Sequence, residues 1–87
     1  MKNLIQKLTE TFGPSGYESA IRDVIRAEVE PLADEIRVDA LGSLIVRKGP
    51  TKSKDKAKRI MIAAHMDEIG IIATHIDENG FVRFTGI

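Results

Sequence analysis

The sequence predicts an α/β fold in which two helices come first and strands follow. Up to Val29 the apolar residues recur at helical spacing, which is the period of a helix with one covered face. From Glu35 onward they alternate with polar residues, which is the period of a half-buried strand. No crossover helix is expected between the strands. The chain should therefore place two helices against a sheet that its later residues build.

The first helix is predicted to begin at the N-terminus and to end at Gly13-Pro14, a pair that does not continue a helix. The second helix is predicted to follow Ser15, which stands three residues before Glu18 in a capping-box pattern. Pro31 should end or bend this helix. Both helices are amphipathic, so each needs an apolar surface larger than the other helix to cover its face.

Two short strands are predicted, one at residues 36–38, where apolar and polar residues alternate, and one at residues 44–46, which are all apolar. The stretch between them, "ALGS", is typical of a turn. We therefore expect these two strands to follow one another directly along the chain.

The remaining strands are predicted after the lysine-rich stretch. Residues 60–64 are apolar on both faces, which is typical of an inner strand in a covered sheet. Residues 69–76 are extended, and the Asn79-Gly80 pair is a strong signal for a hairpin turn. Residues 81–85 should form the returning strand.

Length and composition limit the class of protein. The 87 residues are enough for one small domain or for part of a larger one. The 13 basic and 13 acidic residues cancel, so net charge favours neither nucleic acid nor membrane as a partner. The absence of cysteine excludes a disulfide framework and a cysteine zinc site. Neither a signal peptide nor a membrane-spanning apolar run is recognisable, so the cytoplasm is the expected location.

Residues 47–59 are rich in lysine, which raises the question of a nucleic-acid or anionic-lipid site. No aromatic residue is interleaved to stack on bases, and Asp55 interrupts the run. We expect a solvated loop that protects a neighbouring strand from aggregation. Nucleic-acid binding is the alternative, and steep salt dependence would reveal it. The basic residues concerned are Lys48, Lys52, Lys54, Lys56, Lys58 and Arg59.

Two stretches, "HMDEIG" and "HIDENG", nearly repeat each other. Residues two apart in an extended chain point the same way, so His65 should pair with Asp67, and His75 with Asp77. In such a pair a neutral imidazole can bind a divalent metal, and the carboxylate can bind too or orient the ring. The spacing by itself is a weak signal.

Context favours the first copy. His65 ends the most apolar strand, where the ligand-binding groups of open α/β sheets usually lie. From its residues alone, His65 is either a metal ligand or a hydrogen-bonded structural histidine. His75 precedes the Asn79-Gly80 pair, and turn chemistry explains Asp77 there. His75 is therefore expected to be a surface strand residue.

The stretches "FGPSGYES", "VDALGSLIV", "IMIAAHMDEIG" and "THIDENGFVRF" resemble, in this order, the N-terminal segment of a known family. This family consists of the dinuclear-metal aminopeptidases that are called glutamyl aminopeptidase, deblocking aminopeptidase or cellulase M. It includes the tetrahedral TET peptidases. The resemblance implies that residues 1–68 begin a zinc-aminopeptidase-type α/β catalytic domain and that residues 69–87 begin an inserted β-rich domain. It also implies hydrolysis of the N-terminal residue of peptides by an enzyme with two divalent metal ions, zinc or cobalt. A homo-oligomer is expected, which in TET-type relatives is a tetrahedral dodecamer.

On this pattern His65 matches a histidine that binds one of the two metals, and Asp67 matches the acid that supports it. The family's bridging aspartate, its glutamate general base and its other ligands would lie beyond Ile87. A catalytic zinc site needs about three protein ligands and a water. The chain alone is therefore expected to be inactive and to bind metal weakly at most. Its expected partners are peptide substrates and the remainder of the parent enzyme. The alternative is a non-catalytic module with one structural zinc on His65, Asp67, His75 and Asp77.

Overall fold

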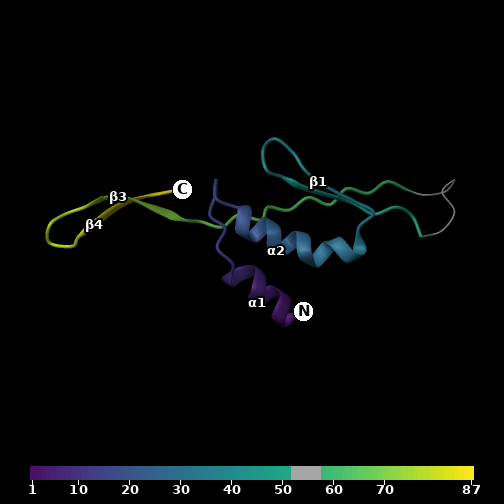
Figure 1. Cartoon of the computed structure of the whole chain (residues 1–87), viewed down its shortest axis with the longest axis horizontal. Coiled ribbons are helices and arrows are strands. Elements are labelled where there is room, and N and C mark those ends of the chain that lie inside the picture. Colours follow the sequence, from purple (N-terminus) through teal and green to yellow (C-terminus); the bar gives the residue numbers. More distant parts are fainter. Residues whose placement is uncertain (52–57) are drawn as a thin grey trace.

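The computed structural model describes residues 1–51 and 58–87. Within these ranges, two α-helices are followed by two separate antiparallel sheets of two strands each. Figure 1 shows the helices beside the first hairpin and the second hairpin projecting away from them. The predicted α/β class, with helices before strands, is confirmed.

Helix α1 spans Lys2–Glu10 and helix α2 spans Ser19–Val29, and the 3-10 turn η1, Glu30–Leu32, follows α2. The prediction that Pro31 ends the second helix is thus confirmed. Helix α2 contacts both α1 and strand β2. Ile21 of α2 is 3% exposed, and besides Gly13 and Pro14 it is the one buried residue in the described ranges. No helix in the described ranges has both the length and the apolar character needed to cross a membrane.

The predicted capping box at the start of α2 is wrong. Glu18 takes the N-cap position but makes no side-chain cap bond. Its Oε1 instead accepts a hydrogen bond from the backbone N–H of Gly16 at 2.7 Å. The hydroxyl of Ser15 donates to Asp67 Oδ2 at 2.5 Å, across 52 residues of sequence. The Ser15 hydroxyl therefore bonds to a residue that is distant in the sequence and does not cap the helix.

The first hairpin pairs β1, Glu35–Val38, with β2, Leu44–Arg47, and both strands lie close to their predicted positions. Asp39 closes the connecting turn, because its Oδ1 accepts the backbone N–H groups of Leu41 at 3.0 Å and Ser43 at 2.9 Å. The bond from Ser43 has the largest effect and lowers the pKa of Asp39 below its ordinary value. The predicted turn between these strands is confirmed.

The second hairpin pairs β3, Ile71–Ile76, with β4, Val82–Gly86. Asp77 organises its turn, since its Oδ1 accepts the backbone N–H groups of Asn79 and Phe81, each at 2.9 Å. This is the side-chain-to-backbone bonding for which aspartate is favoured in turns. The hairpin predicted from the Asn-Gly pair is confirmed.

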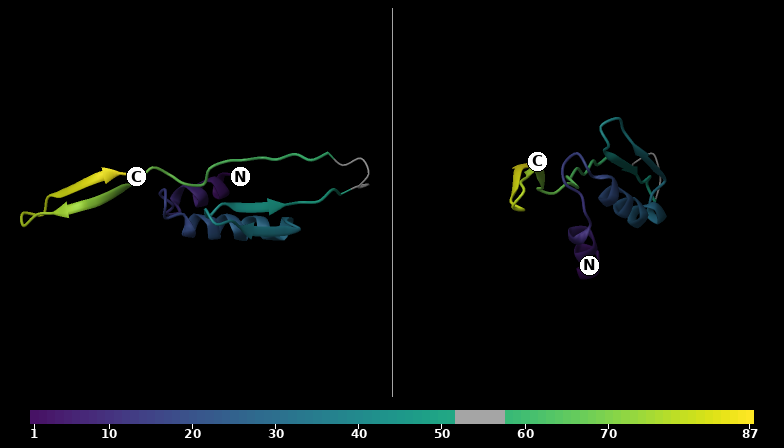
Figure 2. Two further views of the ribbon diagram at one scale, coloured as in Figure 1. Left: turned by 90° about the horizontal axis from the view of Figure 1, so that it is seen from above. Right: turned by 60° about the vertical axis from the view of Figure 1, so that its left-hand side comes forward.

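Residues 60–64 do not form the predicted inner strand. Figure 2 shows the segment running beside β2, but no backbone hydrogen bond joins the two. A space of about 400 Å³ lies between them, and Ile60, Met61 and Ile62 are 84–91% exposed. The prediction fails because a strand needs a partner. In the part of the chain that the structure describes, nothing pairs with this segment or covers it.

Part of the lysine-rich stretch, including Lys52, Lys54 and Lys56, lies outside the described residues. At its start, Lys48 Nζ lies 3.5 Å from Asp34 Oδ1, and both side chains are about half exposed. Such a surface ion pair adds little to stability. The expected solvated loop and the nucleic-acid alternative both stay predictions.

Replacing Gly13 by alanine should loosen helix α2. A Cβ atom at position 13 would lie 2.5 Å from Cγ2 of Ile21, the buried side chain of α2. Overpacking of this kind typically costs about 1–3 kcal/mol. Hydrogen exchange of the α2 amides should therefore accelerate in Gly13→Ala. Gly86→Ala is the matched control, because nothing lies within 4 Å of the added carbon there. Equal α2 protection in both variants would contradict the packing argument.

Candidate functional site

The candidate site begins where the loop of residues 13–15 docks onto the extended segment that carries His65. Glu68 donates its backbone N–H to the carbonyl oxygen of Gly13 at 3.0 Å, and Gly13 donates its own N–H to Glu68 Oε1 at 3.4 Å. Gly13 and Pro14 are buried by this contact region. Gly70 permits the approach, because a Cβ there would lie 2.6 Å from Cβ of Pro14. Gly70 thus allows two distant backbones to meet.

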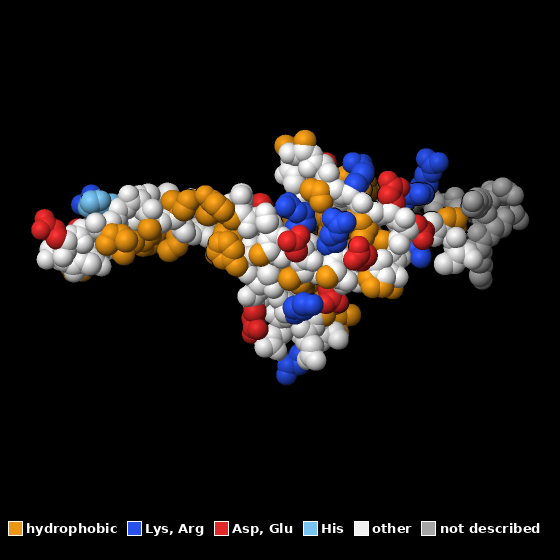
Figure 3. All heavy atoms as spheres, in the orientation of Figure 1, with side chains coloured by type: hydrophobic (Ala, Val, Ile, Leu, Met, Phe, Trp, Pro, Cys, Tyr) orange, Lys and Arg blue, Asp and Glu red, His pale blue; other side chains and the backbone are white. Residues whose placement is uncertain are grey.

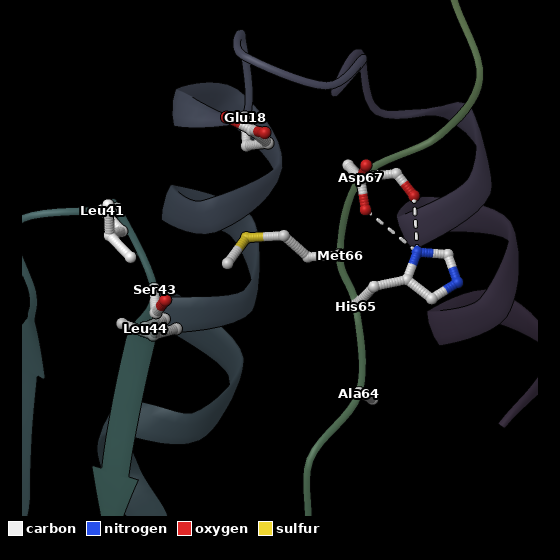
Figure 4. Close-up of a pocket in the computed structure, with 9 residues that line it drawn as sticks. Glu18, Leu41, Ser43, Leu44, Ala64, His65, Met66 and Asp67 are labelled. Atoms are coloured by element: carbon white, nitrogen blue, oxygen red, sulfur yellow. Dashed lines mark hydrogen bonds and ion pairs between the residues drawn. The ribbon is translucent and has the colours of Figure 1, made fainter.

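The imidazole of His65 is held through one nitrogen. Its Nδ1 lies 2.9 Å from the backbone oxygen of Asp67 and 3.0 Å from Asp67 Oδ1, as Figure 4 shows. A backbone carbonyl can only accept, so Nδ1 must carry the hydrogen in this arrangement. In the neutral imidazole the lone pair then resides on Nε2, which is the nitrogen available to a ligand. The prediction that these two residues share a face is confirmed.

Asp67 links His65 to the 13–15 loop. Its Oδ1 faces His65, and its Oδ2 accepts the hydroxyl hydrogen of Ser15 at 2.5 Å. The hydrogen bond from Ser15 first, and that from His65 second, lower the pKa of Asp67 below its ordinary value. Both bonds favour the ionised carboxylate, which is the form that accepts from an imidazole N–H. The side chains of Ser15, Asp67 and His65 form one chain of hydrogen bonds.

Ser15 is a member of this site that the sequence reasoning missed. Its position three residues before Glu18 fits a capping pattern, which predicts a local partner for its hydroxyl. No local period can reveal a contact across 52 residues. A sequence signal for this residue is its place in the stretch "FGPSGYES", which is one of the stretches that carry the resemblance.

A cavity of about 220 Å³ lies beside this segment, but the imidazole does not point into it. Met66, Leu41 and Leu44 contribute to its lining, and in Figure 4 the Met66 side chain extends toward Leu44. The His65 ring lies on the opposite side of the chain, where its side chain is 85% exposed. The cavity therefore accommodates the neighbouring methionine and is not built around the histidine.

The second copy of the motif is arranged differently. His75 lies exposed in β3 opposite Arg83, and the carboxylate of Asp77 is occupied by the turn. Turn chemistry thus accounts for Asp77, as expected. In residues 1–51 and 58–87, no three histidine, cysteine or acidic side chains converge as a metal site would require. The alternative zinc site on His65, Asp67, His75 and Asp77 is not assembled here. The first copy offers one free nitrogen ligand.

Comparison with known proteins places these features in a family. A family model described as M42 glutamyl aminopeptidase matches residues 42–87. A protein of Acetivibrio thermocellus is 48% identical over 87 residues, which are 100% of this chain and 25% of that protein. The lysyl aminopeptidase of Pyrococcus furiosus is 40% identical over 85 residues, covering 97% of this chain and 23% of the enzyme.

A solved structure has the same fold over nearly the whole chain. The TET aminopeptidase from a marine sediment Thaumarchaeota archaeon superposes with a TM-score of 0.80 at 37% identity. The match covers 98% of this chain and 23% of that structure. The chain therefore spans about a quarter of the length of the relatives it matches.

Proposed function

Because this chain belongs to the M42 glutamyl aminopeptidase family, we propose that it is the N-terminal segment of a metal-dependent aminopeptidase. The reaction is hydrolysis of the N-terminal residue of peptides. The hydrogen-bonding of His65 carries the proposal, since both partners of Nδ1 are acceptors and Nε2 is left with its lone pair. A histidine prepared in this way is a typical ligand of a catalytic divalent metal.

Within this chain His65 is the metal ligand and Asp67 holds its ring. A carboxylate behind a ligating histidine fixes the tautomer and raises the basicity of the ligand. When bound, two divalent ions, zinc or cobalt, would polarise the scissile carbonyl and lower the pKa of a water. His65 provides one ligand of the set, and the rest of the ligands and the general base come from the remainder of the parent enzyme. Alone, residues 1–87 do not catalyse the reaction.

The parent enzyme is proposed to be a homo-oligomer that takes peptides as substrates. The solved relative is named as a TET aminopeptidase, which supports an assembly of this type. A boundary between the catalytic domain, residues 1–68, and an inserted β domain that begins at residue 69 is proposed as well. The support is that, among the residues the structure describes, β3 pairs only with β4, and that their hairpin projects from the helices in Figure 1.

A chimera tests this function. Residues 1–87 would replace the matching segment of the lysyl aminopeptidase of Pyrococcus furiosus, with which they share 40% identity. We expect the chimera to release N-terminal lysine from peptides, to lose that activity on chelation of its metals and to regain it with zinc or cobalt. A chimera that assembles to the size of the unmodified enzyme but has no metal-restored activity would contradict the proposal.

A further inference from the structure

We propose that Ser15 is a positioning residue that locks the Asp67 carboxylate against His65. The inference rests on the proposed function, because it assigns Ser15 a part in preparing the metal ligand. Ser15 touches neither the imidazole nor any atom that would react. Its effect passes through Asp67, whose Oδ2 accepts its hydroxyl hydrogen at 2.5 Å.

The argument begins with the freedom of an aspartate side chain. A carboxylate held at one oxygen can rotate about its bonds and release its partner. In Asp67 both oxygens are engaged, Oδ1 by His65 at 3.0 Å and Oδ2 by Ser15 at 2.5 Å. With the hydroxyl in place, Oδ1 stays directed at Nδ1, and Nε2 of His65 faces outward. Residues that orient a metal ligand in this indirect way typically change metal affinity when they are replaced.

Ser15 is itself held firmly enough to act as a fixed point. Its predecessor Pro14 forms a parallel bridge with Glu68, and Gly13 and Glu68 exchange two hydrogen bonds, of 3.0 and 3.4 Å. The loop is anchored to the same segment that carries Asp67, so the distance between hydroxyl and carboxylate is set by backbone contacts. Precise placement of this kind is what a ligand-supporting group requires.

The competing explanation for Ser15, that it caps helix α2, does not hold in the structure. The helix begins at Ser19, its N-cap is Glu18, and it has no side-chain cap bond. The only side-chain partner of the Ser15 hydroxyl among the described residues is Asp67. Removing the hydroxyl should therefore leave the helix intact and act on Asp67.

The first test uses the chimera after its metals have been removed, so that residues 1–87 are folded together with the rest of an enzyme. The protein is labelled with ¹⁵N-histidine, the signals of His65 and His75 are assigned by their loss in His65→Ala and His75→Ala, and His75 serves as the internal reference. At alkaline pH, His65 should show a hydrogen on Nδ1 and none on Nε2. Ser15→Ala should shift part of the His65 population to the other tautomer, and Ser15→Thr, which keeps the hydroxyl, should restore the parent spectrum. His75 signals should not change in either variant.

The second test measures zinc affinity in the chimera. We expect Ser15→Ala to weaken binding by about fivefold to tenfold, at or below the lower end of what replacing a ligand-supporting residue usually costs. Ser15→Thr should return it to the parent value, and Asp67→Asn should weaken it further. Ser19→Ala is the matched control, because that hydroxyl contacts Arg22 at 3.3 Å and lies outside the hydrogen-bond chain.

Hydrogen exchange at the Glu68 amide separates positioning from folding, because that amide reports whether the 13–15 loop is docked. The proposal is supported if Ser15→Ala changes the His65 tautomer and zinc affinity while Glu68 stays protected. It is overturned if Ser15→Ala matches the parent in both measurements, if threonine fails to restore them, or if Glu68 loses protection. Failure of the chimera to bind metal would count against the proposed function, whereas the tautomer measurement would still decide the role of Ser15.

Discussion

In the chimera with a complete set of ligands, His65→Ala should remove one of the two metal ions and nearly all peptidase activity. The free lone pair on Nε2 is the reason, because no other described side chain near the site offers a nitrogen ligand. Metal ions contribute several kcal/mol to transition-state charge stabilisation. Since about 1.4 kcal/mol corresponds to a tenfold change in rate, we expect a loss on the order of a thousandfold. Elemental analysis of the purified variant and kcat/KM on a lysyl peptide measure the two effects.

His75→Ala is the matched control for this prediction. It removes the same side chain from the nearly identical stretch ten residues later, but from an exposed position in β3. This variant should retain both metals and most of the activity. If the two substitutions caused equal losses, the assignment of His65 as the ligand would have to be abandoned.

The comparison of these two histidines shows what sequence reasoning can reach. Both copies have the same spacing, and only their neighbours distinguish them. Asp77 is followed by Asn79-Gly80, so a local rule predicts that its carboxylate serves the turn, and the structure has this arrangement. The pairing of His65 with Asp67 followed from the geometry of an extended chain. These features depend on residues a few positions apart, which is why they could be predicted.

The features that could not be predicted depend on distant partners. Ser15 satisfies a capping pattern, yet its hydroxyl bonds to Asp67 because the loop that contains it is docked on Glu68. Residues 60–64 have the composition of a covered strand, but composition does not supply a neighbouring strand. Local sequence indicates what a segment is suited to, whereas the contacts realised in the fold depend on which other segments are present.

The 87-residue chain by itself should not behave as a compact monomer. Its radius of gyration is 18.2 Å, whereas a compact domain of this length has a radius of about 12 Å. Ile21 and Pro14 are the only buried apolar side chains of the described residues, so little apolar surface is removed from water. The open side of residues 60–64 and the edges of the β3–β4 hairpin leave backbone groups without strand partners.

Exposed apolar side chains make association favourable. Figure 3 shows hydrophobic atoms along the projecting hairpin, where Ile76, Phe81 and Phe84 are 62–72% exposed. The returning strand has Arg83 as its only charged residue, and a single charge is weak protection against pairing with another copy. We therefore expect the isolated chain to self-associate, to exchange strands between copies or to become ordered only with the remainder of its parent. A compact monomer that unfolds cooperatively, seen by light scattering and denaturant titration, would contradict this expectation.

The same isolated chain should show no aminopeptidase turnover when zinc or cobalt is added. A catalytic zinc needs about three protein ligands. Among the described residues, no two further ligand side chains lie close enough to His65 to complete such a set. Zinc titration of the 87-residue chain should accordingly show weak binding or none. Tight binding of one zinc per chain would instead favour the alternative hypothesis, a non-catalytic module with one structural zinc. The activity measurement should use chain purified from a peptidase-deficient host, with His65→Ala as the control for contamination. Metal-dependent release of an N-terminal residue by the unsubstituted 87-residue chain but not by its His65→Ala variant would refute the expectation, because the residues present would then suffice for catalysis.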